Sequence, residues 1–126
     1  MRDFVVVSIG AIFGANARYI LSRFAAKMLG PVFPYGTLFV NILGCLVAGI
    51  LAAVFTSRFT IRQDYQLALA VGFLGGFTTF SAFGLQSFEL LSSGQIPKAL
   101  FYVASSIVFG ILAVFLGYGL LTRLIR

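Results

Sequence analysis

Residues 72–83, with the sequence GFLGGFTTFSAF, combine three glycines, two adjacent threonines and one serine inside a long hydrophobic run. Glycine lowers helix stability by about 1 kcal/mol relative to alanine, and threonine and serine side chains can hydrogen-bond to backbone groups that a helix has released. In lipid, irregular backbone is tolerated only where it is buried in protein or lines a watery cavity. Carbonyls and amides exposed there can hold ions. The segment therefore predicts a break in a membrane helix that serves as an ion site.

The composition is that of an integral membrane protein. Of 126 residues, 60% are hydrophobic and 10% are charged, whereas a soluble domain has about 25% charged residues. The uncharged runs predict a single all-α membrane domain, residues 1–126, because a bilayer needs about 20 apolar residues for each crossing. Its four helices are expected at about residues 4–21, 35–56, 65–91 and 99–121. The apolar N-terminal stretch has no small-residue cleavage pattern, so we expect it to be retained.

The titratable residues argue against several kinds of function. The chain has no histidine, one cysteine and three acidic residues, which offer neither a metal-ligand cluster nor a hydrolytic site. Cys45 has no partner for an internal disulfide and is expected to pack against a neighbouring helix. A proton-coupled transporter needs an ionisable residue well inside the membrane, and we expect Glu89 to lie at its interface. The net charge of +6 comes mostly from basic residues at helix ends, which favours contact with lipid over nucleic acid.

The polar residues that remain inside the expected helices are neutral hydrogen-bond donors. They favour a small anion over a cation, and phenylalanine rings can present their positive edges to the same ligand. Other interpretations of these residues stay open. Asn41 can hold helices together instead of lining a path, Phe80 and Phe83 can be packing or lipid-facing residues, and Arg18 can extend to the membrane surface instead of attracting anions. The donors are Thr37, Asn41, Thr78, Thr79, Ser81 and Ser106.

The distribution of basic residues across the expected membrane is nearly even. Four helices place both termini and the second loop on one side, and the first and third loops on the other. The first side has five basic residues (Arg2, Arg58, Arg62, Arg123, Arg126) and the other has Arg23, Lys27 and Lys98, with Arg18 as a possible fourth. So weak a bias permits insertion in both orientations and an antiparallel homodimer, without requiring either. Four helices can hardly enclose a pore alone, so we expect an oligomer.

Three blocks of sequence resemble those of one known family. They are Gly10-x3-Gly14-x3-Arg18-Tyr19, then Gly36-Thr-Leu-x-Val-Asn41-x2-Gly44, and then Gly72-Phe-x-Gly-Gly-x-Thr-Thr-Phe-Ser-x-Phe83. In this order and spacing the chain resembles the CrcB/Fluc fluoride channels. The resemblance implies a dual-topology antiparallel homodimer in a bacterial inner membrane, with two pores and with the 65–91 helix broken at mid-membrane. It implies passive export of fluoride to relieve toxicity, and no enzymatic activity.

The resemblance also implies roles for individual residues. The backbone carbonyls of Gly75 and Thr78 would bind one structural Na⁺ at the dimer centre. Phe80 and Phe83 would line the fluoride path, and Arg18 would lie at its vestibule. The polar residues of the path would be Asn41, Thr37, Ser81, Thr79, Tyr102 and Ser106. The chain departs from the family at Ala82, Gln86 and Gly110, where Thr, Glu and Ser are common.

Two other classes of function make different demands. A proton-coupled small transporter would need a pH gradient and an essential carboxylate, for which Glu89 is the candidate. A purely structural membrane protein would carry no flux, and substitutions of Phe80 and Phe83 would then have no effect on ion movement.

Overall fold

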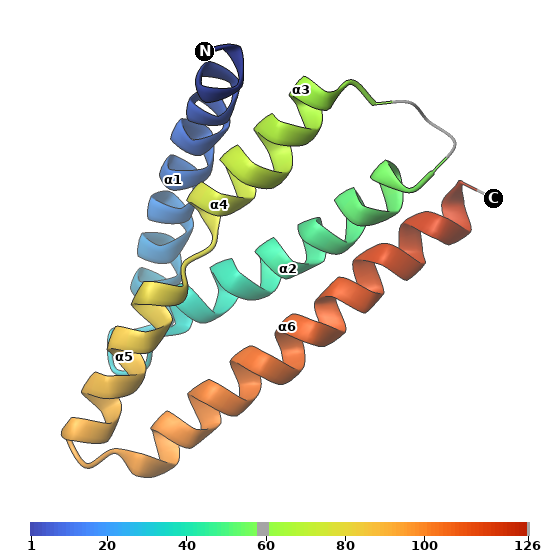
Figure 1. Ribbon diagram of the computed structural model, residues 1–126. Helices are drawn as coiled ribbons and strands as arrows, with labels where there is room; N and C mark the ends of the chain where they lie inside the picture. Colours follow the sequence, from blue (N-terminus) through green and yellow to red (C-terminus); the bar gives the residue numbers. More distant parts are fainter. Residues whose placement is uncertain (58–60, 126) are drawn as a thin grey trace.

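The computed structural model describes residues 1–57 and 61–125, a range that does not include Arg58 and Arg126. The described residues form helices and no strand, as predicted (Figure 1). Four helical segments are long and apolar enough to cross a membrane: Arg2–Leu29, Tyr35–Phe55, Gln63–Ser92 and Ile96–Leu124. The elements are α1 (Arg2–Leu29), α2 (Tyr35–Phe55), α3 (Gln63–Gln66), the π-helix η1 (Leu67–Phe73), α4 (Leu74–Phe77), α5 (Phe80–Ser92) and α6 (Ile96–Leu124).

The first and last helices are longer than their uncharged runs. α1 continues past the predicted end at residue 21 to Leu29, because long basic side chains can lie along a helix and keep their charge in water. It stops where Gly30 takes a left-handed φ of 86° and a proline comes next in the chain. α6 begins at Ile96 with a proline in its first turn, which a helix tolerates, and ends at Leu124.

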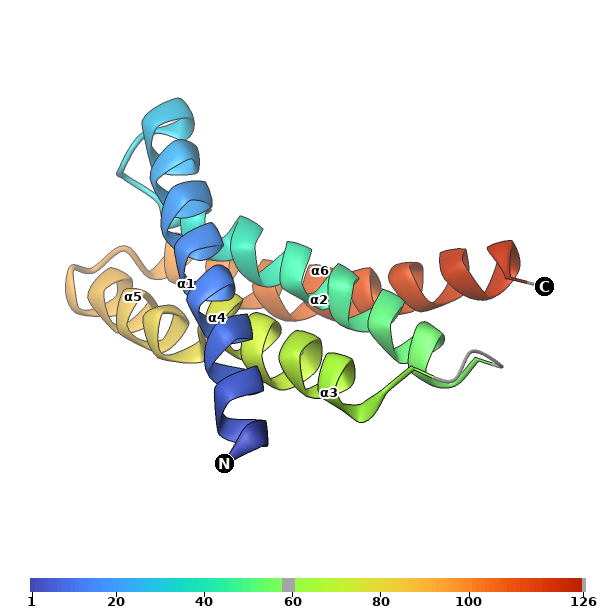
Figure 2. The same cartoon turned by 90° about the horizontal axis from the view of Figure 1, so that it is seen from above.

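α2 and α6 lie side by side and run in the same direction, opposite to the α3–α5 segment (Figure 1). Glycines bring the two backbones close together. A Cβ atom at Gly49 would fall on the Val114 carbonyl, and one at Gly117 would fall on the Leu46 carbonyl. Small residues drive such close packing of membrane helices. α1 runs across this pair (Figure 2).

α1 packs against η1 and α4 through glycines on both sides. A Cβ atom at Gly10 or Gly14 would meet the backbone of η1 or α4, as the predicted packing role of this GxxxG pair requires. On the facing side, a Cβ atom at Gly72 would lie 2.5 Å from the Val7 carbonyl oxygen, and one at Gly76 would lie 2.7 Å from that of Ala11. The π-helical turn was not expected, because apolar residues alone do not distinguish i→i+5 from i→i+4 hydrogen bonding.

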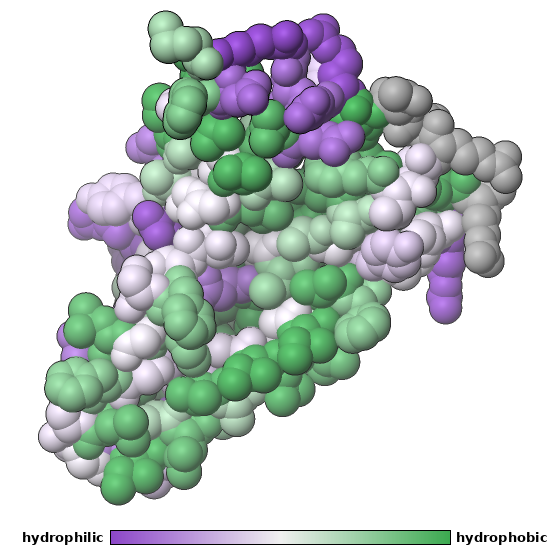
Figure 3. All heavy atoms as spheres, in the orientation of Figure 1, coloured by the Kyte–Doolittle hydropathy of each residue, from purple (hydrophilic) through white to green (hydrophobic). Residues whose placement is uncertain are grey.

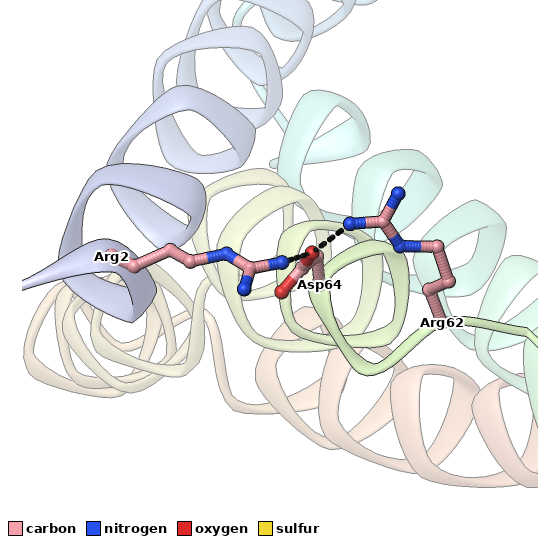
Figure 4. A network of polar contacts seen from close by, with 3 residues as sticks. All are labelled: Arg2, Arg62 and Asp64. Atoms are coloured by element: carbon pink, nitrogen blue, oxygen red, sulfur yellow. Dashed lines mark hydrogen bonds and ion pairs between the residues drawn. The ribbon is translucent and has the colours of Figure 1, made fainter.

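The surface of the single chain is largely apolar. Hydrophobic residues cover most of the face in Figure 3, and polar ones gather mainly around the N-terminus and the start of α3. At that polar end Arg2 and Arg62 approach Asp64 from opposite sides, and both form ion pairs with it (Figure 4). Large side chains such as Phe115, which is 73% exposed, project from the apolar region. Such a surface suits lipid or another membrane-embedded protein.

Candidate functional site

The third membrane-crossing segment is interrupted at two threonines. Thr78 (φ −82°, ψ 158°) and Thr79 (φ −149°, ψ 112°) have extended backbone between α4 and α5. The N–H and Oγ1 of Thr78 both donate to the Leu74 carbonyl, at 2.9 and 2.8 Å, and this ends α4. Thr79 Oγ1 accepts the Ala82 N–H at 3.2 Å, which is an N-cap at the start of α5. The threonines thus end one helix and begin the next.

The three glycines of the same stretch are not at the interruption. Gly72 lies in η1, and Gly75 and Gly76 lie in α4, all with helical backbone. Glycine is tolerated in these helices because Gly72 and Gly76 allow α1 to approach closely. The expectation that glycine and hydroxyl residues together break the helix is therefore wrong for the glycines, and the hydroxyl residues mark the position.

Asn41 of α2 lies opposite the interruption. Its Oδ1 accepts the N–H of Thr79 at 2.8 Å, and its Nδ2 donates to the carbonyl oxygen of Thr79 at 3.1 Å. One carboxamide therefore pairs with both backbone groups of an extended residue, as a neighbouring strand would do. The two sequence-based interpretations of Asn41 are compatible, since the side chain joins α2 to the third segment and also lines a cavity.

This cavity, of about 390 Å³, lies beside the interruption, between α2, α4, α5 and α6. Six of the residues predicted to handle ions line it: Asn41, Thr78, Thr79, Phe80, Phe83 and Ser106. Acidic and basic side chains are absent from its lining as far as the structure describes the chain. The groups around the space are hence an amide, hydroxyls and aromatic rings. The hydroxyls of Thr78 and Ser106 donate to the carbonyls of Leu74 and Tyr102. The groups of this set that suit an anion are therefore the remaining N–H of Asn41, the Thr79 hydroxyl and the ring edges.

The two phenylalanines of the cavity are neighbours. The ring centroids of Phe80 and Phe83 are 5.5 Å apart with an interplanar angle of 38°, and the rings of Phe83 and Tyr102 are 5.4 Å apart. Phe80 is 84% exposed in the single chain, whereas Tyr102 is completely buried. The rings of Tyr102, Phe83 and Phe80 thus form a row from the packed interior to an exposed edge of the single chain.

The other predicted path residues lie around the cavity and not in its lining. The Tyr102 hydroxyl donates to Gln86 Oε1 at 2.9 Å, and Thr37 is buried at 6% exposure. Ser81 is exposed, with its Oγ 3.3 Å from Thr79 Oγ1. Arg18 lies beside the interruption, with Nη1 3.5 Å from the Thr78 carbonyl oxygen. An ion in the cavity would therefore meet the six lining residues before it meets any of these four.

The backbone at the interruption has carbonyls that suit a hard cation, which prefers oxygen ligands. In a continuous helix the Thr79 N–H would donate to the Gly75 carbonyl, but here it donates to Asn41. The first N–H groups of α5 have no helical acceptor to reach back to, and that of Ala82 uses the Thr79 hydroxyl in place of the Thr78 carbonyl. The oxygens of Gly75 and Thr78 are thus released from bonding within the helix, and Arg18 Nη1 lies 3.5 Å from that of Thr78. Carbonyl oxygens of this kind are the ligands that the predicted Na⁺ would take.

Known proteins resemble the chain over nearly its whole length. Residues 5–118 match the family described as "CrcB-like protein, Camphor Resistance (CrcB)". The chain belongs to this family. Proteins named "Fluoride-specific ion channel FluC" are similar to it: that of Chloroflexus aurantiacus is 45% identical over 120 residues, 95% of each chain. That of Rhizobium etli is 39% identical over 125 residues, 99% of this chain and 100% of the relative, and that of Trichormus variabilis is 44% identical over 118 residues, 93% and 86%.

Membership in the CrcB-like family settles the general class of this chain. Its relatives are named as ion channels, which places it in a non-enzyme family of fluoride channels, as predicted. Four segments able to span a membrane, together with bacterial relatives, indicate a multi-pass protein of a bacterial membrane.

Sequence reasoning assigned no role in the ion path to five residues that line the cavity of this CrcB-like chain. A Cβ atom at Gly44 would fall on the Thr78 methyl group, so glycine is needed for α2 to pass close to the interruption. Cys45 packs near Gly110, where a Cβ atom would meet its Sγ at 3.4 Å. The spacing of three, four and seven residues from Asn41 was the available signal for three of them. The five are Gly44, Cys45, Ala48, Leu74 and Ile107.

Proposed function

We propose that this protein is a fluoride-selective passive ion channel that exports fluoride from the cytoplasm and so relieves its toxicity. The observation that carries the proposal is the cavity at the interrupted helix, lined by Asn41, hydroxyl residues and two phenylalanines and without a charged side chain among the described lining residues. The proposal is supported by relatives that are named fluoride-specific channels.

The chemistry of the lining accounts for passage of a small anion. Fluoride is strongly hydrated, so it enters only where donors replace its water, and it leaves only where no site binds it too tightly. Asn41 retains one N–H beyond the one given to Thr79. Phe80 and Phe83 offer ring edges next to it. Neutral donors in sequence allow the ion to move from one to the next.

We further propose that the channel is a dual-topology antiparallel homodimer with two pores. Phe80 stands at the edge of the cavity with 84% of its surface uncovered, and a second copy would complete the wall there. Near-equal numbers of basic residues on the two sides permit both orientations. A two-fold arrangement is also the commonest closed assembly. Of the path residues outside the lining, Arg18 is assigned to the vestibule, and Thr37, Ser81 and Tyr102 are assigned to the polar side of the path.

The carbonyls of Gly75 and Thr78 would hold one Na⁺, shared with the same atoms of the second copy at the dimer centre. When bound there, the cation supplies positive charge that joins the two chains and offsets the desolvation of a nearby anion. The chain's own contribution is to keep these two oxygens out of helical hydrogen bonds, through Asn41 and the Thr79 hydroxyl.

Fluoride efflux from proteoliposomes tests the function. Liposomes loaded with potassium fluoride or potassium chloride are treated with valinomycin, and the released anion is followed with an ion-selective electrode at equal pH on both sides. We expect fluoride efflux without a pH gradient and far slower chloride efflux. Phe80→Ile should reduce fluoride efflux to the level of protein-free liposomes.

Phe88→Ile is the matched control, because Phe88 is also exposed on α5 but does not line the cavity. Its efflux should equal that of the unchanged protein. No fluoride efflux, or fluoride and chloride efflux at equal rates, would overturn the proposal. Efflux that requires a pH gradient and is lost in Glu89→Gln would instead identify a proton-coupled transporter.

A further inference from the structure

An extended residue inside a membrane segment creates a local problem. Thr79 has neither a helical nor a strand partner for its backbone, and unpaired backbone groups are strongly disfavoured where water is scarce. Both groups are nevertheless paired, and the same side chain of α2 satisfies both. The distances of 2.8 and 3.1 Å are those of good hydrogen bonds.

The side chain that provides these bonds is itself firmly placed. Asn41 comes directly after Val40, which is completely buried, and precedes Gly44 by one helical turn. Gly44 leaves the room that lets the Thr78 side chain lie against α2. A planar carboxamide has its donor and acceptor side by side, so it matches the N–H and C=O of one extended residue. Aspartate lacks the donor, and leucine, of similar size, lacks both.

The conformation of Thr79 determines how α5 begins. The Thr79 hydroxyl caps Ala82 at the start of α5, and Phe80 is the first residue of that helix. The direction of α5 sets where the Phe80 and Phe83 rings lie. Binding the Thr79 N–H also keeps it from the Gly75 carbonyl, which would otherwise be its helical acceptor.

We propose that Asn41 is a positioning residue, whose main task is to hold Thr79 extended through two hydrogen bonds and thereby to aim the Phe80 and Phe83 rings and release the Gly75 carbonyl. The effect on ion movement rests on the proposed channel function, but the effect on the backbone does not. A direct role in binding the anion is limited to the one N–H of Asn41 that remains.

Residue-resolved amide hydrogen exchange, measured by NMR on the full chain in micelles and paired with fluoride efflux, tests this assignment. In the unchanged protein we expect the Thr79 amide to be protected although it lies outside a helix. Asn41→Leu should speed exchange at Thr79 by about tenfold, the change expected for the loss of one hydrogen bond, and should lower efflux. Asn41→Asp should keep the Thr79 amide protected, since a carboxylate still accepts its N–H, while efflux falls.

Asn16→Leu is the matched control, because within the described residues the Asn16 amide donates to Ile12 of its own helix. It should change neither measurement. Unchanged exchange at Thr79 in Asn41→Leu, combined with lost efflux, would overturn the assignment and make Asn41 a direct anion ligand. If Asn41→Leu does not fold, an unprotected Thr79 amide in Asn41→Asp or in the unchanged protein would overturn it as well. If Asn41→Leu speeds exchange selectively at Thr79 but the unchanged protein shows no fluoride efflux, the result would support the assignment and contradict the proposed function.

Discussion

The two parts of the third membrane segment, on either side of Thr78 and Thr79, are attached to the rest of the chain in different ways. The part before them, Gln63–Phe77, meets α1 backbone against backbone at glycines such as Gly76. α5 meets α6 through side chains, and around Gly84 there is nothing within 4 Å of the position of a Cβ atom. The first part is therefore a rigid support, and the second is an open element that a further surface can cover.

This difference explains where the cavity lies. The glycine-packed part contributes Leu74 to the lining, the loosely covered part contributes Phe80 and Phe83, and Thr78 and Thr79 lie between them. The interruption joins the two. Substitutions that disturb the rigid part should accordingly have larger effects on stability than the same substitutions in the open part.

The largest effect is expected where backbones touch. In Gly14→Ala the added Cβ atom would fall on the Phe73 carbonyl, and neither backbone can move without opening the contact between α1 and η1. Overpacking of this kind costs about 1–3 kcal/mol and sometimes more. We expect a large loss of monodisperse protein on size-exclusion chromatography and a lower unfolding temperature in detergent.

Gly84→Ala is the same change in the open part of the segment. No described atom outside the adjoining stretch of α5 lies within 4 Å of the added atom, and alanine stabilises a helix interior by about 0.5–1 kcal/mol relative to glycine. Its unfolding temperature should be equal or higher. If the two alanine variants behave alike, the proposed contrast between a rigid and an open part is wrong.

Hydropathy predicted the helical class and the four crossings, and the Gly10 and Gly14 spacing predicted a packing contact. These features depend on residues close together in sequence. The π-helix and the helical state of Gly75 and Gly76 were not predictable in this way, because they depend on what packs against them. The pairing of Asn41 with Thr79 spans 38 residues, and no local pattern indicates it. The sequence indicated the candidate site residues, while tertiary contacts determine the role of each.

An intermediate effect is expected where α5 is held by a side-chain bond. Gln86→Leu removes the acceptor of the Tyr102 hydroxyl, which belongs to a fully buried side chain. Thr37 remains a hydrogen-bond partner of this hydroxyl, so we expect a cost near the lower end of the about 1–3 kcal/mol of a buried polar group left unpaired. We expect a lower unfolding temperature, measured by the loss of helical circular dichroism on heating in detergent.

The double variant Gln86→Leu, Tyr102→Phe sharpens this test, because it removes both the donor and the acceptor of this hydrogen bond. Its stability should recover most of the loss caused by Gln86→Leu alone. If the double variant loses as much stability as the sum of the losses in Gln86→Leu and in Tyr102→Phe, the hydrogen bond is not what attaches α5 to α6.

The smallest effect is expected at the outer end of the rigid part, where Asp64 pairs with Arg2 and Arg62. Both arginine side chains are more than half exposed, at 67% and 70%, and exposed ion pairs contribute about 0–1 kcal/mol. Asp64→Asn should hence lower the unfolding temperature only slightly, and the difference should disappear in high salt because salt screens exposed charges. The glycine contacts already hold this part of the segment against α1, so the ion pairs add little to them. A loss as large as that of Gly14→Ala would contradict this ranking and would mean that charge, not close backbone packing, fixes the support of the site.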